Sequence, residues 1–271
     1  MTPIARPDGG APERSELTIV VPTYNERERL DPLLEQIFGV ADRHRIAIQV
    51  IVVDDNSLDG TGECADAWTR RRRVRVVHRA GKLGLGSAVL EGFALADSDI
   101  VGVMDADLSH PPDLIPLLYA TMTGGELDMV VASRYVRGGG TRDWPMGRLL
   151  LSKLACWMAR PLTPVRDATS GFFLVRRERL REFRTAVRGF KIGLELLVRT
   201  RPRHVAEVGY VFVDRASGES KMNMREGVRY LRQLASLYAG GSRSEKRPGH
   251  LIVHTPTKAT HPASAVGRIR A

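Results

Sequence analysis

Apolar residues fall along this chain in two alternating patterns. Short, almost uninterrupted apolar runs cover residues 17–21, 48–53, 74–77, 99–104 and 128–132. The first four are each followed by a segment whose apolar residues recur three and four positions apart, ending near residues 43, 72, 96 and 122. Uninterrupted runs are typical of buried strands, and the longer spacing is typical of helices. The repeated strand–helix order predicts an α/β fold, with a mostly parallel sheet flanked by helices on both faces.

The last third of the chain departs from this pattern. Residues 146–158 and 227–238 have apolar side chains on one side and basic residues on the other, which predicts amphipathic helices. Between them the sequence predicts a helix over 192–199 and a strand over 205–213. Amphipathic helices that carry basic residues and tryptophan are typical of the membrane interface. Packing of the first helix on the sheet explains its pattern equally well.

Composition divides the chain into three segments. Residues 1–15 are rich in proline, glycine and charge, and residues 241–271 carry six basic residues against one acidic residue. Both segments are predicted to be disordered, because such compositions do not support a packed core. Residues 16–240 remain as a single folded domain.

The net charge of +10 indicates an anionic partner, namely a phosphate substrate, a membrane surface or a nucleic acid. The arginine run at 70–73 is explained most simply as the solvated end of a helix. Aromatic residues are not interleaved with the arginines, and the sequence has no helix-turn-helix, RNA-recognition or zinc signature. A nucleic-acid-binding protein is therefore a remote alternative, and no nucleic-acid partner is expected.

The cellular location follows from what the sequence contains. Cys64 and Cys156 lie far apart without metal or redox spacing, which favours a reducing compartment. The sequence shows no N-terminal apolar run typical of a signal peptide, and no apolar stretch approaches the length of about 18 residues that predicts a spanning helix. We expect a cytoplasmic protein that associates peripherally with the cytoplasmic face of a membrane.

Two carboxylates follow the predicted strand at 99–104. Asp105 and Asp107 are separated by one residue and precede a helix with prolines in its first turn. Ligands of open α/β sheets bind at the carboxyl ends of the strands. Two hard oxygen donors at that place suit Mg²⁺ or Mn²⁺ carrying a diphosphate. A solvated acidic turn is the other interpretation of so short a motif.

Polar motifs also follow the other predicted strands. The strand at 17–21 leads into P-T-Y-N-E, the strand at 48–53 into D-D-N-S, and the strand at 205–213 into D-R-A-S-G-E-S-K. After the strand at 74–77 comes G-K-L-G-L-G, which matches neither the dinucleotide fingerprint nor the P-loop. That loop predicts a tight turn whose backbone N–H groups and Lys82 lie near an anion.

Together these motifs resemble the family 2 inverting glycosyltransferases. More narrowly, over residues 17–240, the chain resembles the dolichol-phosphate (polyprenol-phosphate) mannose synthases. The motifs that carry the resemblance are V-P-T-Y-N-E, V-D-D-N-S-x-D-G-T, G-K-L-G-L-G, D-A-D-L-x-H, T-S-G-F and F-V-D-R-x-x-G-E-S-K. The resemblance implies a nucleotide-sugar GT-A fold, which is Rossmann-like. It also implies transfer of mannose from GDP-mannose to a polyprenyl (dolichyl-type) monophosphate at an anionic membrane surface. Transfer of another sugar, as from UDP-glucose, is the alternative.

The resemblance also implies roles for individual residues. The nucleotide-sugar donor would be bound by Pro22, Tyr24, Glu26, Val53, Asp55, Asp105, Ala106 and Arg134. The acceptor phosphate would be bound by Arg215, Ser220 and Lys221. Asp107 would bind Mg²⁺ or Mn²⁺. Ser109 is the candidate second metal residue; it stands where the family usually has glutamine, and its shorter hydroxyl would reach the metal through a water or not at all. Catalysis would depend on Asp105, Asp107, Arg215 and Lys221.

The chemistry of these side chains fits that activity independently of the resemblance. Displacing a nucleoside diphosphate creates negative charge, which a metal on Asp107 together with Arg215 and Lys221 would neutralise. A lipid monophosphate is already an anionic nucleophile near neutral pH, since its second pKa is about 6. We therefore expect no dedicated general base, and we expect in-line attack to invert the anomeric centre.

Overall fold

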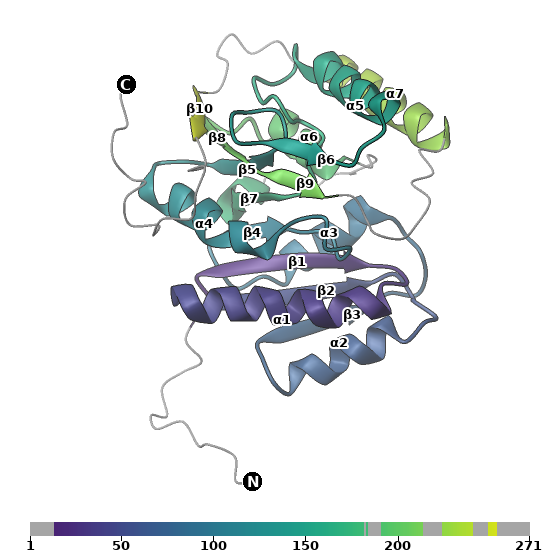
Figure 1. The fold of residues 1–271 in the computed structure, drawn as a ribbon, viewed down its shortest axis with the longest axis vertical. Helices are drawn as coiled ribbons and strands as arrows, with labels where there is room; N and C mark the ends of the chain where they lie inside the picture. Colours follow the sequence, from purple (N-terminus) through teal and green to yellow (C-terminus); the bar gives the residue numbers. More distant parts are fainter. Residues whose placement is uncertain (1–13, 182, 184–190, 214–223, 241–248, 254–271) are drawn as a thin grey trace.

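The fold is built on an eight-stranded sheet (Figure 1). The computed structural model describes residues 14–181, 183, 191–213, 224–240 and 249–253. The strand order is β10-β8-β5-β7-β4-β1-β2-β3. The strands are β1 (Leu17–Thr23), β2 (Ile48–Asp54), β3 (Val74–His78), β4 (Ile100–Val103), β5 (Met129–Ser133), β7 (Phe173–Arg176), β8 (His204–Gly209) and β10 (Gly249–Val253). All neighbours are parallel except that β7 runs antiparallel to both β4 and β5, which confirms the prediction of a mostly parallel sheet.

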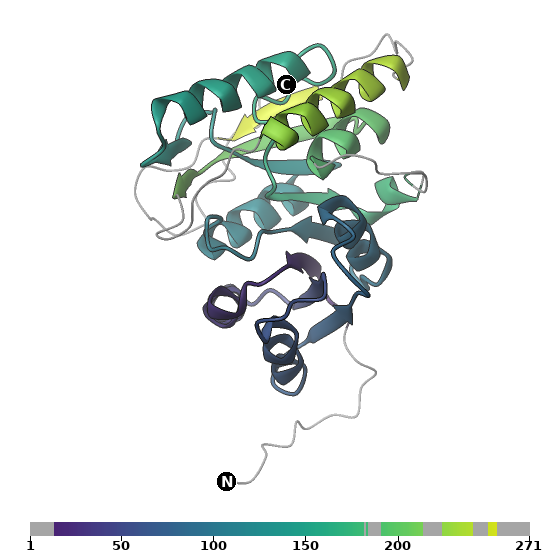
Figure 2. The same ribbon diagram turned by 90° about the vertical axis from the view of Figure 1, so that its right-hand side faces the viewer.

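Helices cover both faces of the sheet (Figures 1 and 2). One face packs against α1 (Arg27–His44), α2 (Thr61–Thr69) and α4 (Ile115–Gly124), and a 3₁₀ turn, η1 (Pro112–Leu114), leads into α4. The other face packs against α3 (Leu85–Ala94) and α6 (Ile192–Arg199). Successive side chains of a strand point to opposite faces, so that Ile19 joins the first core and Val20 the second. Burial on both faces explains the uninterrupted apolar runs of the sequence.

Two further helices lie side by side beyond the sheet (Figures 1 and 2). They are α5 (Met146–Ala159) and α7 (Met224–Gly240), which lie where the sequence predicts helices over 146–158 and 227–238. Tyr230 and Tyr238 of α7 donate hydrogen bonds of 2.6 Å from their hydroxyl groups to the carbonyls of Ala155 and Met158 on α5. An apolar cluster that includes Ala159, Leu234 and Leu237 lies between the two helices.

The prediction of one strand over 205–213 is wrong. The chain forms β8 as far as Gly209 and then β9 (Val211–Val213), which pairs with β6 (Gly140–Arg142) in a separate two-stranded sheet. The Tyr210 N–H donates to the Ser133 carbonyl, while the Gly140 N–H donates to the Tyr210 carbonyl, both at 3.0 Å. These bonds take the chain from one sheet to the other at Tyr210. A Cβ atom on Gly209 would lie 2.5 Å from the Arg137 carbonyl, so only glycine allows this approach.

The C-terminal segment also differs from expectation. Residues 249–253, which the sequence assigns to a disordered tail, form the edge strand β10 beside β8. Their sequence, G-H-L-I-V, has the apolar character of a strand. The His250 imidazole also lies 2.8 Å from the buried Glu207 carboxylate of β8. The remainder of that tail and residues 1–13 lie outside the described residues. Within the described part of the chain, no helix combines the length and the apolar character that crossing a membrane requires.

Candidate functional site

The predicted motifs meet at one edge of the sheet. Because β1, β2, β4 and β5 are mutually parallel, the segments that follow them gather at their shared carboxyl ends. Tyr24 to Glu26 follow β1, Asp55 follows β2, Asp105 to Asp107 follow β4, and Arg134 follows β5. From β1 the chain adds β2 and β3 on one side and then β4 on the other side, so the direction of strand addition reverses at β1, in the middle of this edge. Such a switch point is where open α/β sheets bind ligands.

Hydrogen bonds join the loops after β1 and β2, between residues that are far apart in the sequence. Asn25 adopts a left-handed backbone conformation with φ of 57°, which asparagine tolerates better than most residues. Its N–H donates to Ser57 Oγ at 2.8 Å, and its Oδ1 accepts from the Leu58 N–H at 3.1 Å. The Glu26 N–H donates to Thr61 Oγ1 at 3.0 Å. The two loops therefore form one rigid wall.

The two aspartates after β2 have different partners. Asp54 accepts hydrogen bonds from Thr23 Oγ1 and from the N–H of Ser57, both at 3.0 Å, and thus closes the loop. Asp55 accepts from the Arg79 guanidinium and from the Gly84 N–H, the latter at 3.1 Å. Asp55 therefore connects the end of β2 to the glycine-rich loop, and both carboxylates are buried.

The glycine-rich loop lies beside the β1 motif. The Lys82 ammonium is 3.7 Å from the centre of the Tyr24 ring, close enough for a cation–π contact. Tyr24 is 39% exposed, so part of its ring faces solvent. Pro22 and Val53 are paired neighbours at the ends of β1 and β2. The predicted nucleoside-binding residues are therefore brought together around these loops.

The turn after β4 is closed by its own side chains. Leu108 has a φ of 62°, which reverses the chain between Asp107 and Ser109. One carboxylate oxygen of Asp107, Oδ1, accepts both the Ser109 N–H at 3.0 Å and the Ser109 hydroxyl at 2.5 Å. The hydroxyl of Ser109 is thus directed onto Asp107. Asp107 is 7% exposed, whereas the Asp105 side chain is 37% exposed.

A histidine packs behind this turn. The Asp105 N–H donates to His110 Nδ1 at 3.2 Å, and His110 Nε2 lies 3.8 Å from Asp105 Oδ2. The imidazole is buried and stacks on Phe172 with ring centres 5.2 Å apart. Burial lowers the pKa of His110, against the opposing effect of the Asp105 and Asp107 carboxylates. The ring is therefore neutral at physiological pH.

The donor set of the turn matches a hard divalent cation that also binds a substrate. Within the described residues, no group of three or more His, Cys, Asp or Glu side chains is arranged to hold a metal ion. Mg²⁺ is usually held by one or two carboxylates together with substrate phosphates and water. Asp105 and Asp107 fit that pattern, because a metal here would need oxygen ligands from a bound diphosphate.

Arg134 is held by a partner that the sequence did not reveal. Its Nε and Nη2 donate to the two carboxylate oxygens of Asp167 at 2.7 and 2.6 Å, and Nη2 also donates to Thr169 Oγ1 at 2.9 Å. Burial alone would lower the pKa of Arg134, but the Asp167 carboxylate outweighs it and the pKa is raised. The pKa of Asp167 is lowered, because Arg134 overcomes the opposite effect of burial. The pair is therefore ionised throughout the physiological range.

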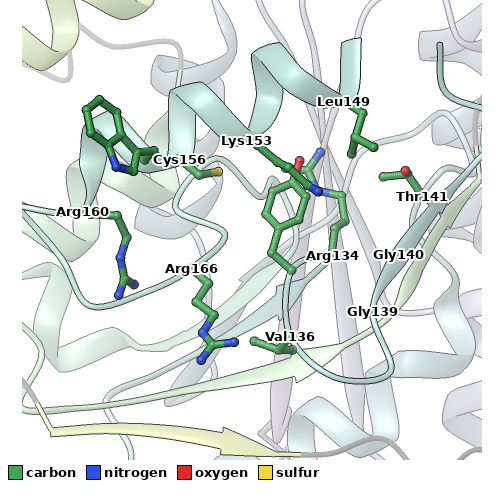
Figure 3. Close-up of a pocket in the computed structure, with 12 residues that line it drawn as sticks. Arg134, Val136, Gly139, Gly140, Thr141, Leu149, Lys153, Cys156, Arg160 and Arg166 are labelled. Atoms are coloured by element: carbon green, nitrogen blue, oxygen red, sulfur yellow. The ribbon is translucent and has the colours of Figure 1, made fainter. Parts of the chain in front are cut away.

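A pocket opens between α5 and the loop at 134–141 (Figure 3). Its volume is about 570 Å³. Lys153 of α5 and Arg160, the residue that follows α5, line it, as do Arg134 and Arg166 from the other side. Apolar side chains complete the wall, including Val136, Leu149 and Trp157. The pocket thus combines positive charge with apolar surface.

The outer surface of α5 is unusually apolar. Met146, Leu150, Leu151, Leu154 and Trp157 are 45–70% exposed. On α7, Val228, Leu231 and Tyr238 are also exposed. Both helices therefore present apolar side chains to the surroundings, and those of α5 lie next to the basic pocket.

Sequence reasoning missed three residues of the site. Arg79 follows β3 directly and could have been noticed as a charge at a strand end. Asp167 lies in a loop without a pattern. Lys191, at the start of α6, has its pKa lowered by burial, and Gln233 of α7 bonds to its backbone N–H and carbonyl at 3.1 and 2.9 Å. The predicted residues Arg215, Ser220 and Lys221 lie outside the described residues, so their roles stay predictions.

Comparison with known proteins gives a consistent result. Residues 18–184 match the family model described as glycosyl transferase family 2. The dolichol-phosphate mannosyltransferases of Pyrococcus furiosus and Saccharomyces cerevisiae are each 38% identical to this chain over 82% of its length. The chain spans 63% of the length of the Pyrococcus protein and 87% of that of the yeast protein. The enzyme of the same name from Mycosarcoma maydis is 37% identical, and the chain spans 78% of it.

Solved structures agree with the fold. Glucosyl-3-phosphoglycerate synthase from Mycobacterium tuberculosis, in complex with Mn²⁺, UDP and glucosyl-3-phosphoglycerate, superposes with a TM-score of 0.59 at 24% identity. The match covers 83% of this chain and 79% of that one. The same enzyme in complex with UDP gives a TM-score of 0.62 at 22% identity, covering 85% and 82%. At this level of identity the likeness establishes the GT-A fold alone.

Proposed function

Because this chain belongs to the family 2 glycosyltransferases, we propose that it transfers mannose from GDP-mannose to a polyprenyl (dolichyl-type) monophosphate. The product would be polyprenyl-phosphate-mannose. The observation that carries the proposal is the 38% identity to two dolichol-phosphate mannosyltransferases over most of the chain. The described site supports it, because carboxylates suited to a nucleotide sugar lie at the same sheet edge as a basic and apolar pocket.

The nucleotide would bind at the loops after β1 and β2. Tyr24 offers a partly exposed ring, and Asp55 offers a carboxylate fixed by Arg79 and Gly84. Pro22, Glu26 and Val53 would complete this wall. Asp105 and Ala106 would contact the donor where the β4 turn begins, with the sugar toward β5.

Asp107 would hold Mg²⁺ or Mn²⁺ against the diphosphate. The metal supplies a counter-charge to the departing nucleoside diphosphate. Ser109 donates to Asp107 Oδ1 from its N–H and its hydroxyl and so fixes the carboxylate that would hold the metal. Arg134, fixed by Asp167, would face the phosphate or sugar from β5.

The lipid acceptor would approach from α5. Lys153, Arg160 and Arg166 surround a pocket that suits an anionic phosphate, and the exposed apolar face of α5 suits a hydrocarbon chain. Arg215, Ser220 and Lys221 would bring further donors to the acceptor phosphate. The same surface would hold the enzyme peripherally on an anionic membrane, which we place at the cytoplasmic face.

In this arrangement one acceptor phosphate oxygen attacks the anomeric carbon while the bond to the nucleoside diphosphate breaks. The acceptor carries its own negative charge near neutral pH, so the enzyme needs to position it rather than to deprotonate it. Attack opposite the leaving group inverts the anomeric centre. Arg215 and Lys221 would share with the metal the task of stabilising the developing charge.

For the sugar donor, UDP-glucose remains as a second candidate. UDP-glucose is bound by the mycobacterial enzyme that shares the fold, and a few pocket contacts decide between bases and sugars. The test offers radiolabelled GDP-mannose and UDP-glucose in parallel, each with polyprenyl monophosphate and Mn²⁺ or Mg²⁺. We expect label in the lipid phase from GDP-mannose only. Label from UDP-glucose alone would replace the proposed donor, and label from neither would contradict the proposed function.

A further inference from the structure

We propose that His110 is a positioning residue that holds Asp105 in the orientation in which it contacts the sugar donor. The inference rests on the proposed function in one respect, namely that Asp105 binds the donor. It explains two sequence features that the function so far leaves without a role. These are the last residue of D-A-D-L-S-H and the glycine of T-S-G-F.

The imidazole lies beside both the backbone N–H and the side-chain carboxylate of Asp105. Nδ1 accepts the backbone N–H of Asp105 at 3.2 Å, so this nitrogen carries no proton. The single proton of the neutral ring is therefore on Nε2, which lies 3.8 Å from Asp105 Oδ2. One ring thus accepts a hydrogen bond from the backbone of Asp105 and lies within electrostatic reach of its carboxylate, at a distance too long for a hydrogen bond. Histidine is suited to this task, since its neutral ring offers one acceptor and one donor.

The imidazole is itself held in place by aromatic rings. It stacks on Phe172 with an interplanar angle of 28°. It also contacts Tyr210 and Phe212 edge-on, with ring centres 6.0 and 5.9 Å away. With His110 only 2% exposed, the ring is enclosed and its rotation is opposed by packing. The core aromatic rings therefore hold His110 in place, and His110 in turn holds Asp105.

Gly171 closes the other side of the pair. A Cβ atom at this position would lie 3.1 Å from Asp105 Oδ2 and 3.4 Å from His110 Cε1. A side chain at this position would therefore crowd the Asp105 carboxylate and the edge of the imidazole. The T-S-G-F segment and the turn after β4 are thus fitted together around a single carboxylate.

The first test compares two substitutions that remove different parts of the imidazole. His110→Phe keeps a flat ring for Phe172 and removes both nitrogens. His110→Asn keeps an acceptor that can reach the Asp105 N–H and removes the Nε2 donor. We expect His110→Phe to lower kcat about 10- to 100-fold, the range typical when a supporting hydrogen bond behind a functional ligand is lost. His110→Asn should retain more activity than His110→Phe.

Calorimetry separates positioning from general damage. We expect the affinity of His110→Phe for GDP with Mn²⁺ to stay within about twofold of the parent, because Asp55 and Asp107 are unchanged, while affinity for GDP-mannose falls. The matched control is Phe38→Leu, which removes a buried stacked ring between α1 and α2, away from Asp105. Parent kcat in His110→Phe would overturn the proposal. So would equal losses in His110→Phe and Phe38→Leu at matched melting temperatures.

A double substitution tests the connection to Asp105 directly. If His110 acts through Asp105, His110→Phe should have almost no further effect on GDP-mannose affinity in an Asp105→Asn background. Additive losses would show that His110 acts by another route and would overturn the proposal. The proposed function is judged separately, on the parent enzyme alone. If the parent uses another nucleotide sugar, the same variants are measured with that donor.

Discussion

The side proposed to bind the nucleotide and the side proposed to bind the lipid, called here the nucleotide side and the lipid side, are built in different ways. On the nucleotide side, which comprises the loops after β1 and β2 and the glycine-rich loop, polar side chains are fixed by hydrogen bonds to one another. On the lipid side, which comprises α5, α7 and the pocket beneath α5, apolar side chains and cations are exposed. In the first arrangement the polar groups already have hydrogen-bond partners within the protein, so the surface is stable in contact with water. The second leaves surface that a membrane lipid would cover, and this difference supports a soluble donor and a lipid acceptor.

The largest effect is expected where the two sides meet. Asp107→Asn should abolish transfer with either metal, because the amide lacks the charge that holds a hard cation. Circular dichroism and the melting temperature should remain close to those of the parent. The matched control is Asp113→Asn, which makes the same change at an exposed surface ion pair with Arg43. Near-parent turnover of Asp107→Asn with metal present would contradict the role of Asp107.

The next largest effect is expected at the buried Arg134–Asp167 ion pair, which supports the lipid side. Asp167→Asn leaves the buried Arg134 guanidinium without its carboxylate, which should lower the free energy of unfolding by about 3–5 kcal/mol. Asp99→Asn, at an exposed ion pair with Arg14, should cost less than about 1 kcal/mol. Urea denaturation of both variants measures the difference. A loss of unfolding free energy as small as that of Asp99→Asn would contradict the stabilising role of the Arg134–Asp167 pair.

The same pair predicts an acid dependence with a defined sign. Because the pKa of Asp167 is lowered in the folded state, its stabilisation is present above the usual carboxyl pKa of about 3.9 and is lost as the pH falls through the lower folded value. The parent should therefore lose stability on acidification below about pH 4 more steeply than Asp167→Asn. Parallel stability curves for the two proteins would contradict this contribution.

The apolar face of α5 gives a test of intermediate size. Replacing Leu150, Leu154 and Trp157 together by serine should weaken flotation with anionic vesicles at least about tenfold, since each side chain can contribute about 1.5 kcal/mol or more when buried. Leu58→Ser, at an exposed apolar residue of the nucleotide side, should leave flotation unchanged. If the triple variant floats like the parent, another segment such as the basic tail carries the membrane contact.

The cations of the pocket should give the smallest effect. Lys153→Gln and Arg160→Gln should each weaken the interaction with anionic vesicles or the acceptor by about 1 kcal/mol, with a reduced dependence on salt. Arg71→Gln, which makes the same change of charge between α2 and β3 rather than at the pocket, is the control. Equal effects of all three substitutions would indicate net charge rather than a local pocket.

Sequence patterns located most of the fold, because strands covered on both faces must be apolar throughout and their helices must carry apolar stripes. They could not reveal the antiparallel β7, since its four residues, F-L-V-R, do not encode direction. The division at Tyr210 depends on contacts with Ser133 and Gly140, which are distant in sequence.

The site was predictable to a similar extent. Asp105 and Asp107 were predicted from their place after a strand, whereas the roles of Asp55 and Arg134 were implied by the family resemblance and stay predictions. The roles of their partners were not predicted, because Arg79, Asp167 and His110 act through bonds formed only when loops meet. Motifs therefore identify the groups proposed to bind a ligand more readily than the groups that hold them in place.

The central claim is that the acceptor is a polyprenyl monophosphate, and the most direct measurement compares that lipid with its free alcohol. Both are offered at equal concentration with radiolabelled GDP-mannose and metal, and label in the lipid phase is counted. We predict transfer to the phosphate and none to the alcohol, because the alcohol would need a carboxylate base to remove its proton. Comparable transfer to the alcohol would contradict the claim and would direct attention to Asp214 and Glu219, the two carboxylates of the D-R-A-S-G-E-S-K motif, as candidate bases.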